Sequence, residues 1–263
     1  MNKLTTTSRP KKSTLLFTLI MMALTMGGGG LPSPATASTK PACTRMTFEL
    51  SAYVVCSFKI PKSKLKLFHK DNNGKNFAQF SVLANAVKAK GRTLKFAMNA
   101  GMYHLNRNPV GLFIEDGQRK FPAQTGNAPG NFFMKPNGVF YVGRKKAGIL
   151  ETKTFLKNKI SPLYATQSGP MLVIKGKLHP RFLPYSRSLH RRNGVGVSKN
   201  GRLTIFAISD APVNFHTFAR FFKDKLKTPN ALYLDGTVSA LYAPELGRND
   251  IGLPMGPIIG VIE

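Results

Sequence analysis

The stretch Ala231-Leu232-Tyr233-Leu234-Asp235-Gly236-Thr237-Val238-Ser239 gives the clearest indication of how this chain folds. Its apolar start predicts a buried β-strand, and that strand ends at a carboxylate followed by glycine. Only 11 of the 263 residues are acidic, against 39 Lys and Arg, so a carboxylate at a strand end needs an explanation. Two explanations stay open: a polar group held there for function, or an Asp-Gly turn that closes a hairpin.

The pattern of the remaining sequence predicts an α+β fold that contains this strand. Further strands are expected at 46–48, 53–56, 65–69, 94–97, 110–115, 163–166, 171–174, 203–208 and 258–262. Residues 132–134 and 139–142 read as a hairpin. Apolar residues at helical spacing predict one helix around 77–90 and a second after Asn214. Because strands and helices do not alternate regularly, we expect one domain with a mixed or antiparallel sheet and two main amphipathic helices.

The first 37 residues are typical of a secretory signal peptide. A basic start is followed by a short apolar run over 15–26 and by Ala35-Thr36-Ala37, a small-residue cleavage site. The run is shorter than a stable membrane span, which needs about 20 residues; an uncleaved anchor is the alternative. We therefore expect an exported protein whose domain occupies 45–263, with no stable membrane span after cleavage.

The charge indicates an anionic partner. Removing residues 1–37, which carry four basic and no acidic residues, lowers the formal net charge from +28 to +24. Phosphodiesters, acidic glycans and lipid headgroups all suit such a protein, although a basic composition also serves solubility. The basic residues are scattered and line no single helix, so nucleic acid is not expected as a partner.

The two cysteines, Cys43 and Cys56, lie close together at the start of the expected domain. In an oxidising compartment such a pair predicts a disulfide; free thiols are the alternative. No histidine stands nearby at ligand spacing, so a metal site is disfavoured.

Four polar clusters at expected strand ends combine glycines with hydrogen-bonding side chains. They are Asn99-Ala100-Gly101-Met102-Tyr103, Gln167-Ser168-Gly169-Pro170, Arg191-Arg192-Asn193-Gly194-Val195-Gly196 and Asp235-Gly236-Thr237-Val238-Ser239. Glycines either admit a ligand close to the backbone or shape a turn. Together with Asn131-Phe132-Phe133 and Pro136-Asn137-Gly138-Val139-Phe140, these segments resemble the phosphodiester glycosidase domain over roughly 45–263.

That family includes the animal lysosomal "uncovering enzyme", which removes N-acetylglucosamine from a sugar phosphodiester, and many exported bacterial members. Relatives often have Asp-Gly-Gly and Asn-Gly-Gly where this chain has Asp235-Gly236-Thr237 and Asn99-Ala100-Gly101. The resemblance implies a hydrolase that cleaves a glycosyl phosphodiester in an anionic envelope or extracellular glycan.

This reaction needs a carboxylate for the oxocarbenium-like centre and donors for the phosphate oxygens. Asp235 is the expected nucleophile or base, and Glu115 the second carboxylate unless it belongs to an ordinary turn. Arg192 is the expected phosphate-binding cation; the alternative is a surface arginine beside Arg191. The other expected substrate-binding residues are Asn99, Gly101, His104, Ser168 and His216. For Asn99 and Ser168 the alternative is hydrogen bonding to the loop backbone. Asp235 could also ligate a divalent cation, but no ligand set accompanies it. The alternative function is a non-catalytic envelope protein that binds an anionic polymer; the oligomeric state is left open.

Overall fold

The computed structural model describes residues 42–235 and 238–263. The predicted signal peptide and the pair Gly236-Thr237 lie outside the described residues. Lys40–Glu263 form one compact unit. Among the residues described, no helix combines the length and the apolar character needed to cross a bilayer.

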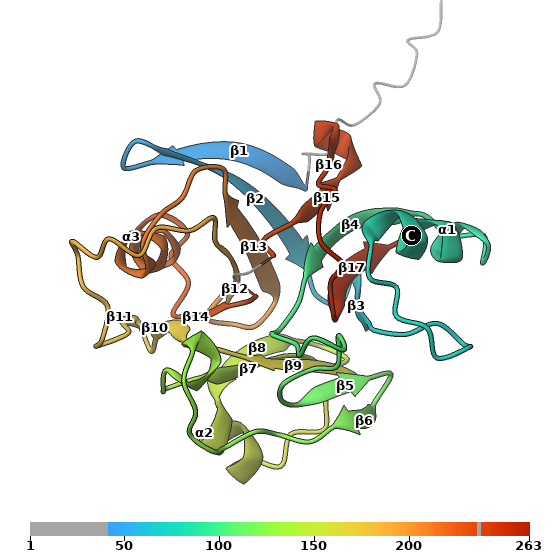
Figure 1. The fold of residues 1–263 in the computed structure, drawn as a ribbon, viewed down its shortest axis with the longest axis horizontal. Helices are drawn as coiled ribbons and strands as arrows, with labels where there is room; N and C mark the ends of the chain where they lie inside the picture. Colours follow the sequence, from blue (N-terminus) through green and yellow to red (C-terminus); the bar gives the residue numbers. More distant parts are fainter. Residues whose placement is uncertain (1–41, 236–237) are drawn as a thin grey trace, which may run out of the picture. The chain divides into compact units, whose positions relative to one another are not determined.

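The strands form three antiparallel sheets (Figure 1). The first sheet contains, in spatial order, β1 (Cys43–Phe48), β2 (Ser51–Lys59), β13 (Leu203–Ser209), β12 (Asn193–Val197), β14 (Asn230–Tyr233), β10 (Met171–Ile174) and β11 (Lys177–Leu178). The second contains β16 (Arg248–Asn249), β15 (Leu241–Ala243), β4 (Leu94–Asn99), β17 (Ile258–Ile262) and β3 (Lys64–Phe68). The third contains β6 (Gln118–Phe121), β5 (Phe113–Glu115), β9 (Tyr164–Ser168), β7 (Gly138–Val142) and β8 (Ala147–Glu151).

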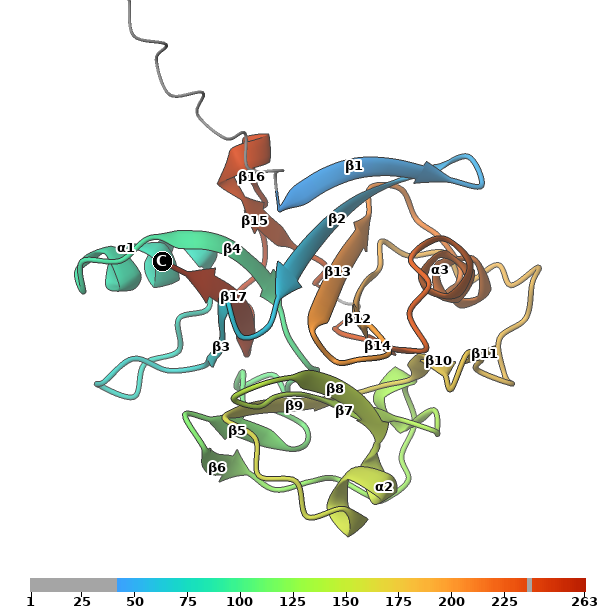
Figure 2. The same cartoon turned by 180° about the vertical axis from the view of Figure 1, so that it is seen from behind.

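The inner faces of the three sheets meet in one core, around which the sheets are arranged in both views (Figures 1 and 2). Phe206 of the first sheet lies 5.0 Å from Phe96 of the second and 6.0 Å from Phe140 of the third, measured between ring centroids. Offset or edge-on aromatic contacts at these distances stabilise a core beyond the apolar area that they bury.

Each sheet also carries a helix on its outer face. Helix α1 (Phe80–Lys88) packs its buried apolar residues on the second sheet, and the short helix α2 (Thr152–Lys157) packs Phe155 on the third. Helix α3 (Phe215–Arg220) continues as a π-helical turn (Phe221–Lys225) and covers the first sheet. Short 3₁₀ turns occupy Asn131–Phe133 and Pro244–Leu246.

The α+β fold predicted from the sequence is confirmed, as are the two main helices. Asn214 begins α3 as predicted, because its Oδ1 accepts a hydrogen bond from the Thr217 N–H at 2.8 Å. The short helix α2 was not predicted, and the single sheet expected is divided into three.

The predicted hairpin around 135–138 is wrong. Asn131–Phe133 form a 3₁₀ turn, and the Asn137 side chain donates to the Phe132 carbonyl at 2.9 Å, which closes a loop there. The partners of β7 are β8 and β9, both later in the chain.

The predicted disulfide is confirmed. Cys43 and Cys56 are bonded, and they face one another across the β1–β2 pair. The bond therefore fixes the register of the first two strands of the domain.

Candidate functional site

The carboxylate singled out in the sequence lies at the exit of β14, where the three sheets come together. The Leu234 N–H donates to the Asn193 carbonyl at 3.2 Å, and the Asp235 N–H donates to the Ala100 carbonyl at 3.1 Å. These bonds fasten the end of β14 to β12 in its own sheet and to the segment after β4 in the second sheet. The next strand, β15, belongs to that second sheet, so Asp235 does not close a β14–β15 hairpin.

Two buried asparagines hold the main chain around Asp235. Asn193 Nδ2 donates to Asn99 Oδ1 at 2.8 Å, and the same oxygen accepts from the Ala240 N–H at 2.9 Å. Asn99 Nδ2 in turn donates to the Asp235 carbonyl at 3.3 Å, and Ser239 Oγ lies 3.4 Å from that carbonyl. Both segments flanking Gly236-Thr237 are thereby fixed to the ends of β4 and β12.

Strand β9 of the third sheet contacts the segment that follows β4, next to Asn99. The Gly101 N–H donates to Thr166 Oγ1 at 3.2 Å, and a Cβ on Gly101 would collide with the Gln167 carbonyl oxygen. The missing side chain of Gly101 therefore makes room for β9. Ser168 is fully buried, and its Oγ has no hydrogen-bond partner among the residues described.

The negative charge of Asp235 raises the pKa values of two tyrosines, Tyr103 and Tyr233. Burial raises the pKa of Tyr103, and the charge of Asp235 and a hydrogen bond to it raise that pKa further. Burial raises the pKa of Tyr233 to about 12, with the Arg192 cation opposing this and Asp235 adding to it. The Arg107 guanidinium lies 5.6 Å from the centroid of the Tyr103 ring. Asp235, which is 6% exposed, thus lies close to two neutral phenols.

Arg192 precedes β12, and its side chain is completely buried. The guanidinium lies 3.6 Å from the Phe215 ring centroid, and its Nε donates to the Val213 carbonyl at 2.8 Å. Its terminal nitrogens donate to Tyr233 Oη at 3.4 Å and to the Ser188 carbonyl at 2.9 Å. Burial lowers the pKa of Arg192, and no carboxylate in the described part of the chain forms an ion pair with it. Aromatic faces and carbonyl dipoles hold this cation beside β14.

The remaining predicted site residues are His104, His216 and Glu115. His104 is exposed in the turn that follows Tyr103, and His216 is half-buried in the first turn of α3. Glu115 lines a separate groove of about 720 Å³ beside Lys66 and Asp116. There, burial and the charge of Asp116 raise the pKa of Glu115 to about 7.

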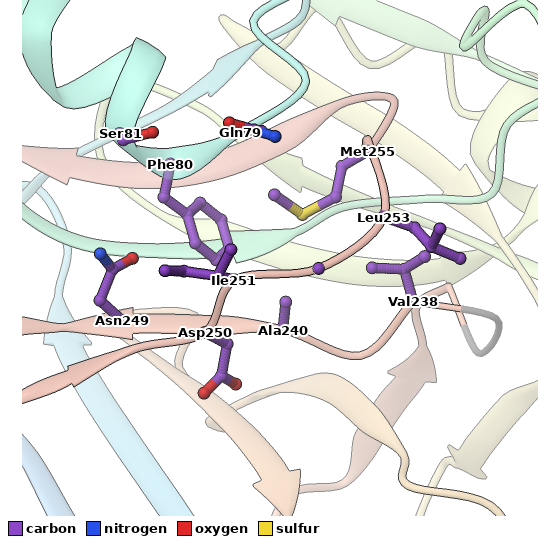
Figure 3. Close-up of a pocket in the computed structure, with 11 residues that line it drawn as sticks. Gln79, Phe80, Ser81, Val238, Ala240, Asn249, Asp250, Ile251, Leu253 and Met255 are labelled. Carbon is purple, nitrogen blue, oxygen red and sulfur yellow. The ribbon is translucent and has the colours of Figure 1, made fainter.

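A second hollow adjoins the Asn99 cluster. This pocket of about 190 Å³ is bounded by Phe80 and Met255, with Val238 and Ala240 along another side (Figure 3). The Asp250 carboxylate points away from it in Figure 3 and pairs with Arg248 at 2.9 Å. The pocket is therefore mainly apolar, and the segment 238–240 separates it from Asn99.

Sequence reasoning overlooked three members of the cluster: Asn193, Tyr103 and Arg107. The first two stand inside the quoted motifs, so the motifs themselves were the available signal. Arg107 belongs to no motif; the turn that follows Tyr103 brings its side chain to the Tyr103 ring. Within the described ranges, no three His, Cys, Asp or Glu side chains gather in a group that could hold a metal ion.

Comparisons with known proteins agree with this architecture. The phosphodiester glycosidase family model matches residues 92–254. The uncharacterized protein YigE of Escherichia coli (strain K12) is 37% identical over 229 residues, which cover 87% of this chain and 86% of YigE.

Two solved structures share the fold. One is the zebrafish N-acetylglucosamine-1-phosphodiester alpha-N-acetylglucosaminidase catalytic domain auto-inhibited by its pro-peptide, with a TM-score of 0.56, 16% identity, and coverage of 85% of this chain and 84% of that one. The other is a putative exported protein from Burkholderia pseudomallei, with a TM-score of 0.52, 10% identity, and coverage of 80% and 74%. At these identities the two structures show a shared fold and no more. The family model, in contrast, matches the sequence itself over 92–254, and the chain therefore belongs to the phosphodiester glycosidase family.

Proposed function

We propose that this protein is an exported hydrolase that cleaves the bond between a sugar and the phosphate of a glycosyl phosphodiester. Membership of the phosphodiester glycosidase family supports the reaction class. The observation that carries the proposal for this chain is the anchoring of Asp235, through Asn99 and Asn193, where the three sheets meet. The predicted signal peptide and the Cys43–Cys56 disulfide support export.

Asp235 would act at the anomeric carbon. As the bond from this carbon to the phosphate oxygen breaks, the electron pair leaves with the phosphomonoester and positive charge develops on the sugar. A carboxylate stabilises that charge, and one of its oxygens can accept the proton of the attacking water. Because a phosphate is already a good leaving group, a second carboxylate is less necessary than in ordinary glycosidases, which suits the separate location of Glu115.

The phosphate would need cationic donors. Arg107 and His104 lie on the turn that follows Tyr103, and we propose that they contact the phosphate oxygens. A phosphate contact from Arg192 stays a prediction. Its buried guanidinium suits a further role, which is to hold Tyr233 and the start of β12 in place.

The experiment uses a synthetic substrate, a sugar 1-(4-nitrophenyl phosphate) diester, prepared with several sugars, and identifies the products by chromatography. A glycosidase releases the sugar and 4-nitrophenyl phosphate, whereas a phosphodiesterase attacking phosphorus releases 4-nitrophenol. In ¹⁸O-labelled water the label must enter the sugar and not the phosphate. We expect Asp235→Asn to lower kcat/KM by at least about 100-fold, which is the usual contribution of a general base.

Asp71→Asn is the matched control. Asp71 also follows a strand and accepts main-chain N–H groups at 2.9 Å, but it does so in an exposed turn. This variant should retain the parental rate, and circular dichroism should establish that both variants are folded. Equal turnover by Asp235→Asn and the parent would remove Asp235 from the mechanism. Binding of the diesters without any product would favour a non-catalytic binder.

A further inference from the structure

The segment between β11 and β12, residues 179–192, runs along the outer side of α3 in both views (Figures 1 and 2). Its anchor is Phe182, which is buried and stacks on Phe215 of α3 with ring centroids 5.0 Å apart and nearly parallel planes. Near its end, His190 and Val213 exchange main-chain hydrogen bonds of 3.2 and 2.8 Å.

Side chains from beneath the segment also bind its backbone. Asn214 Nδ2 donates to the carbonyls of Pro184 and Ser186, at 3.0 and 3.3 Å. Arg192 Nη2 donates to the carbonyl of Ser188 at 2.9 Å. Three alternate carbonyls therefore point inward and are satisfied, and the backbone between them is held in one conformation.

This fixed backbone exposes large apolar side chains. Leu183 is 69% exposed, Tyr185 is 96% exposed and Leu189 is 54% exposed. A single exposed leucine is ordinary on a protein surface, but three large exposed apolar side chains within seven positions of an anchored loop are a concentration that needs an explanation.

The same loop is strongly cationic. Arg181, Arg187 and Arg191 are exposed among these apolar residues. No acidic residue occurs between Glu151 and Asp210, an interval that contains 11 Lys and Arg. The positive potential of the loop is therefore not offset by acidic residues in this interval.

We infer that the loop Arg181–Arg191 binds the surface of an anionic phospholipid bilayer. Arginines attract the anionic headgroups while leucine and tyrosine side chains enter the boundary between headgroups and acyl chains. A hydrated polyanion would satisfy the arginines but would leave Leu183 and Leu189 in water. The combination of both residue types on one anchored loop thus favours a lipid surface over a polysaccharide.

The loop also leads into the candidate site. The Arg191 carbonyl accepts a hydrogen bond from Ser239 Oγ at 3.0 Å, and Asn193 follows two residues later. A bilayer bound at the loop would bring glycosyl phosphodiesters of the envelope near Asp235. This consequence rests on the proposed function; lipid binding itself does not.

The test is a flotation assay with the processed protein isolated from the envelope of the expression host, its N-terminus identified by mass spectrometry. Vesicles are made of phosphatidylcholine alone or with about 30 mol % phosphatidylglycerol. We expect binding to the anionic vesicles only, weakened about tenfold or more between roughly 50 and 500 mM NaCl. The double variants Leu183→Ser/Leu189→Ser and Arg187→Gln/Arg191→Gln should each bind about tenfold more weakly.

Matched controls carry the same changes elsewhere on the surface. Leu50→Ser alters a fully exposed leucine in the β1–β2 turn, and Arg144→Gln/Lys145→Gln removes two charges from the β7–β8 turn. Both should bind as the parent does, and thermal unfolding should show all variants folded. Equal binding to neutral vesicles, or undiminished binding by the leucine variant, overturns the proposal. Loss of binding in the arginine variant alone would show a purely electrostatic contact, of the kind that a hydrated polyanion also makes, and it too overturns the proposal.

Discussion

Asn99 illustrates how one buried side chain can connect several segments of the chain. It is fully buried, its Oδ1 accepts from the Asn193 side chain and the Ala240 N–H, and its Nδ2 donates to the Asp235 carbonyl. No other polar side chain in the described structure joins the ends of β4 and β12 to both sides of Gly236-Thr237 in this way. We therefore regard Asn99 as a positioning residue for Asp235.

This assignment predicts the effect of Asn99→Ala. The change leaves the Ala240 N–H buried without its acceptor, and it leaves Asn193 Nδ2 with only the residue-99 main-chain carbonyl, at 3.4 Å. Each lost hydrogen bond of this kind costs about 1–3 kcal/mol. We expect the free energy of unfolding, measured in urea, to fall by about 2–4 kcal/mol. Asn72→Ala, in an exposed turn, should change it by less than about 0.5 kcal/mol. Similar values for the two variants would contradict the role given to Asn99.

At the residue scale, the sequence predicted Asp235 and Asn99 but not how they are connected. Their side-chain and main-chain contacts join positions 136 residues apart, and the Asn99–Asn193 contact spans 94. Periodicity and turn chemistry act over a few residues, so they can place a polar group at a strand end but cannot choose its partner. Arg192 could be singled out for its charge, yet its complete burial depends on Phe215 and Val213, which come from another element.

At the scale of elements, strands and helices with a clear apolar pattern were predicted well. The strands β4, β13, β14 and β17 and the helices α1 and α3 lie within a few residues of the expected ranges. The division into three sheets was not predictable in this way, because it depends on where the chain leaves one sheet for another. Between β9 and β10 that change takes only Gly169 and Pro170.

A close approach of two elements explains why position 101 is glycine. The backbone of β9 lies where a Cβ of residue 101 would be, so Gly101→Ala must push β9 away from the segment after β4. Overpacking of this kind costs about 1–3 kcal/mol, and we expect that loss in thermal or urea unfolding. Gly252→Ala is the control, since no heavy atom lies within 4 Å of the position that the added methyl group would take. An unchanged stability for Gly101→Ala would mean that the two segments can separate without cost.

At the scale of the whole molecule, the pH dependence of stability follows from buried titratable groups in separate regions. Burial lowers the pKa of His69, whose Nε2 lies 2.9 Å from the Arg107 carbonyl, and burial also lowers the pKa of His179. Glu115 acts in the opposite direction. Its pKa is raised to about 7, so the stability that it contributes is complete at low pH and is lost as the pH rises toward 7.

The two histidines predict a loss of stability in mild acid. Well above their ordinary pKa of 6.5, both histidines are neutral in the folded and the unfolded chain, so they contribute no pH dependence to the stability there. Below pH 6.5 the two histidines become protonated in the unfolded chain while they remain neutral in the folded chain. The free energy of unfolding must therefore fall with falling pH. The slope should approach the uptake of two protons on unfolding. Urea unfolding between about pH 4.5 and 8 measures this slope.

In His69→Gln/His179→Gln the slope should be smaller by that amount, because the Glu115 contribution is common to both proteins and cancels in the difference. His190→Gln, at an exposed position, should keep the parental slope. A double variant with the parental slope would show that the acid sensitivity of the molecule arises elsewhere.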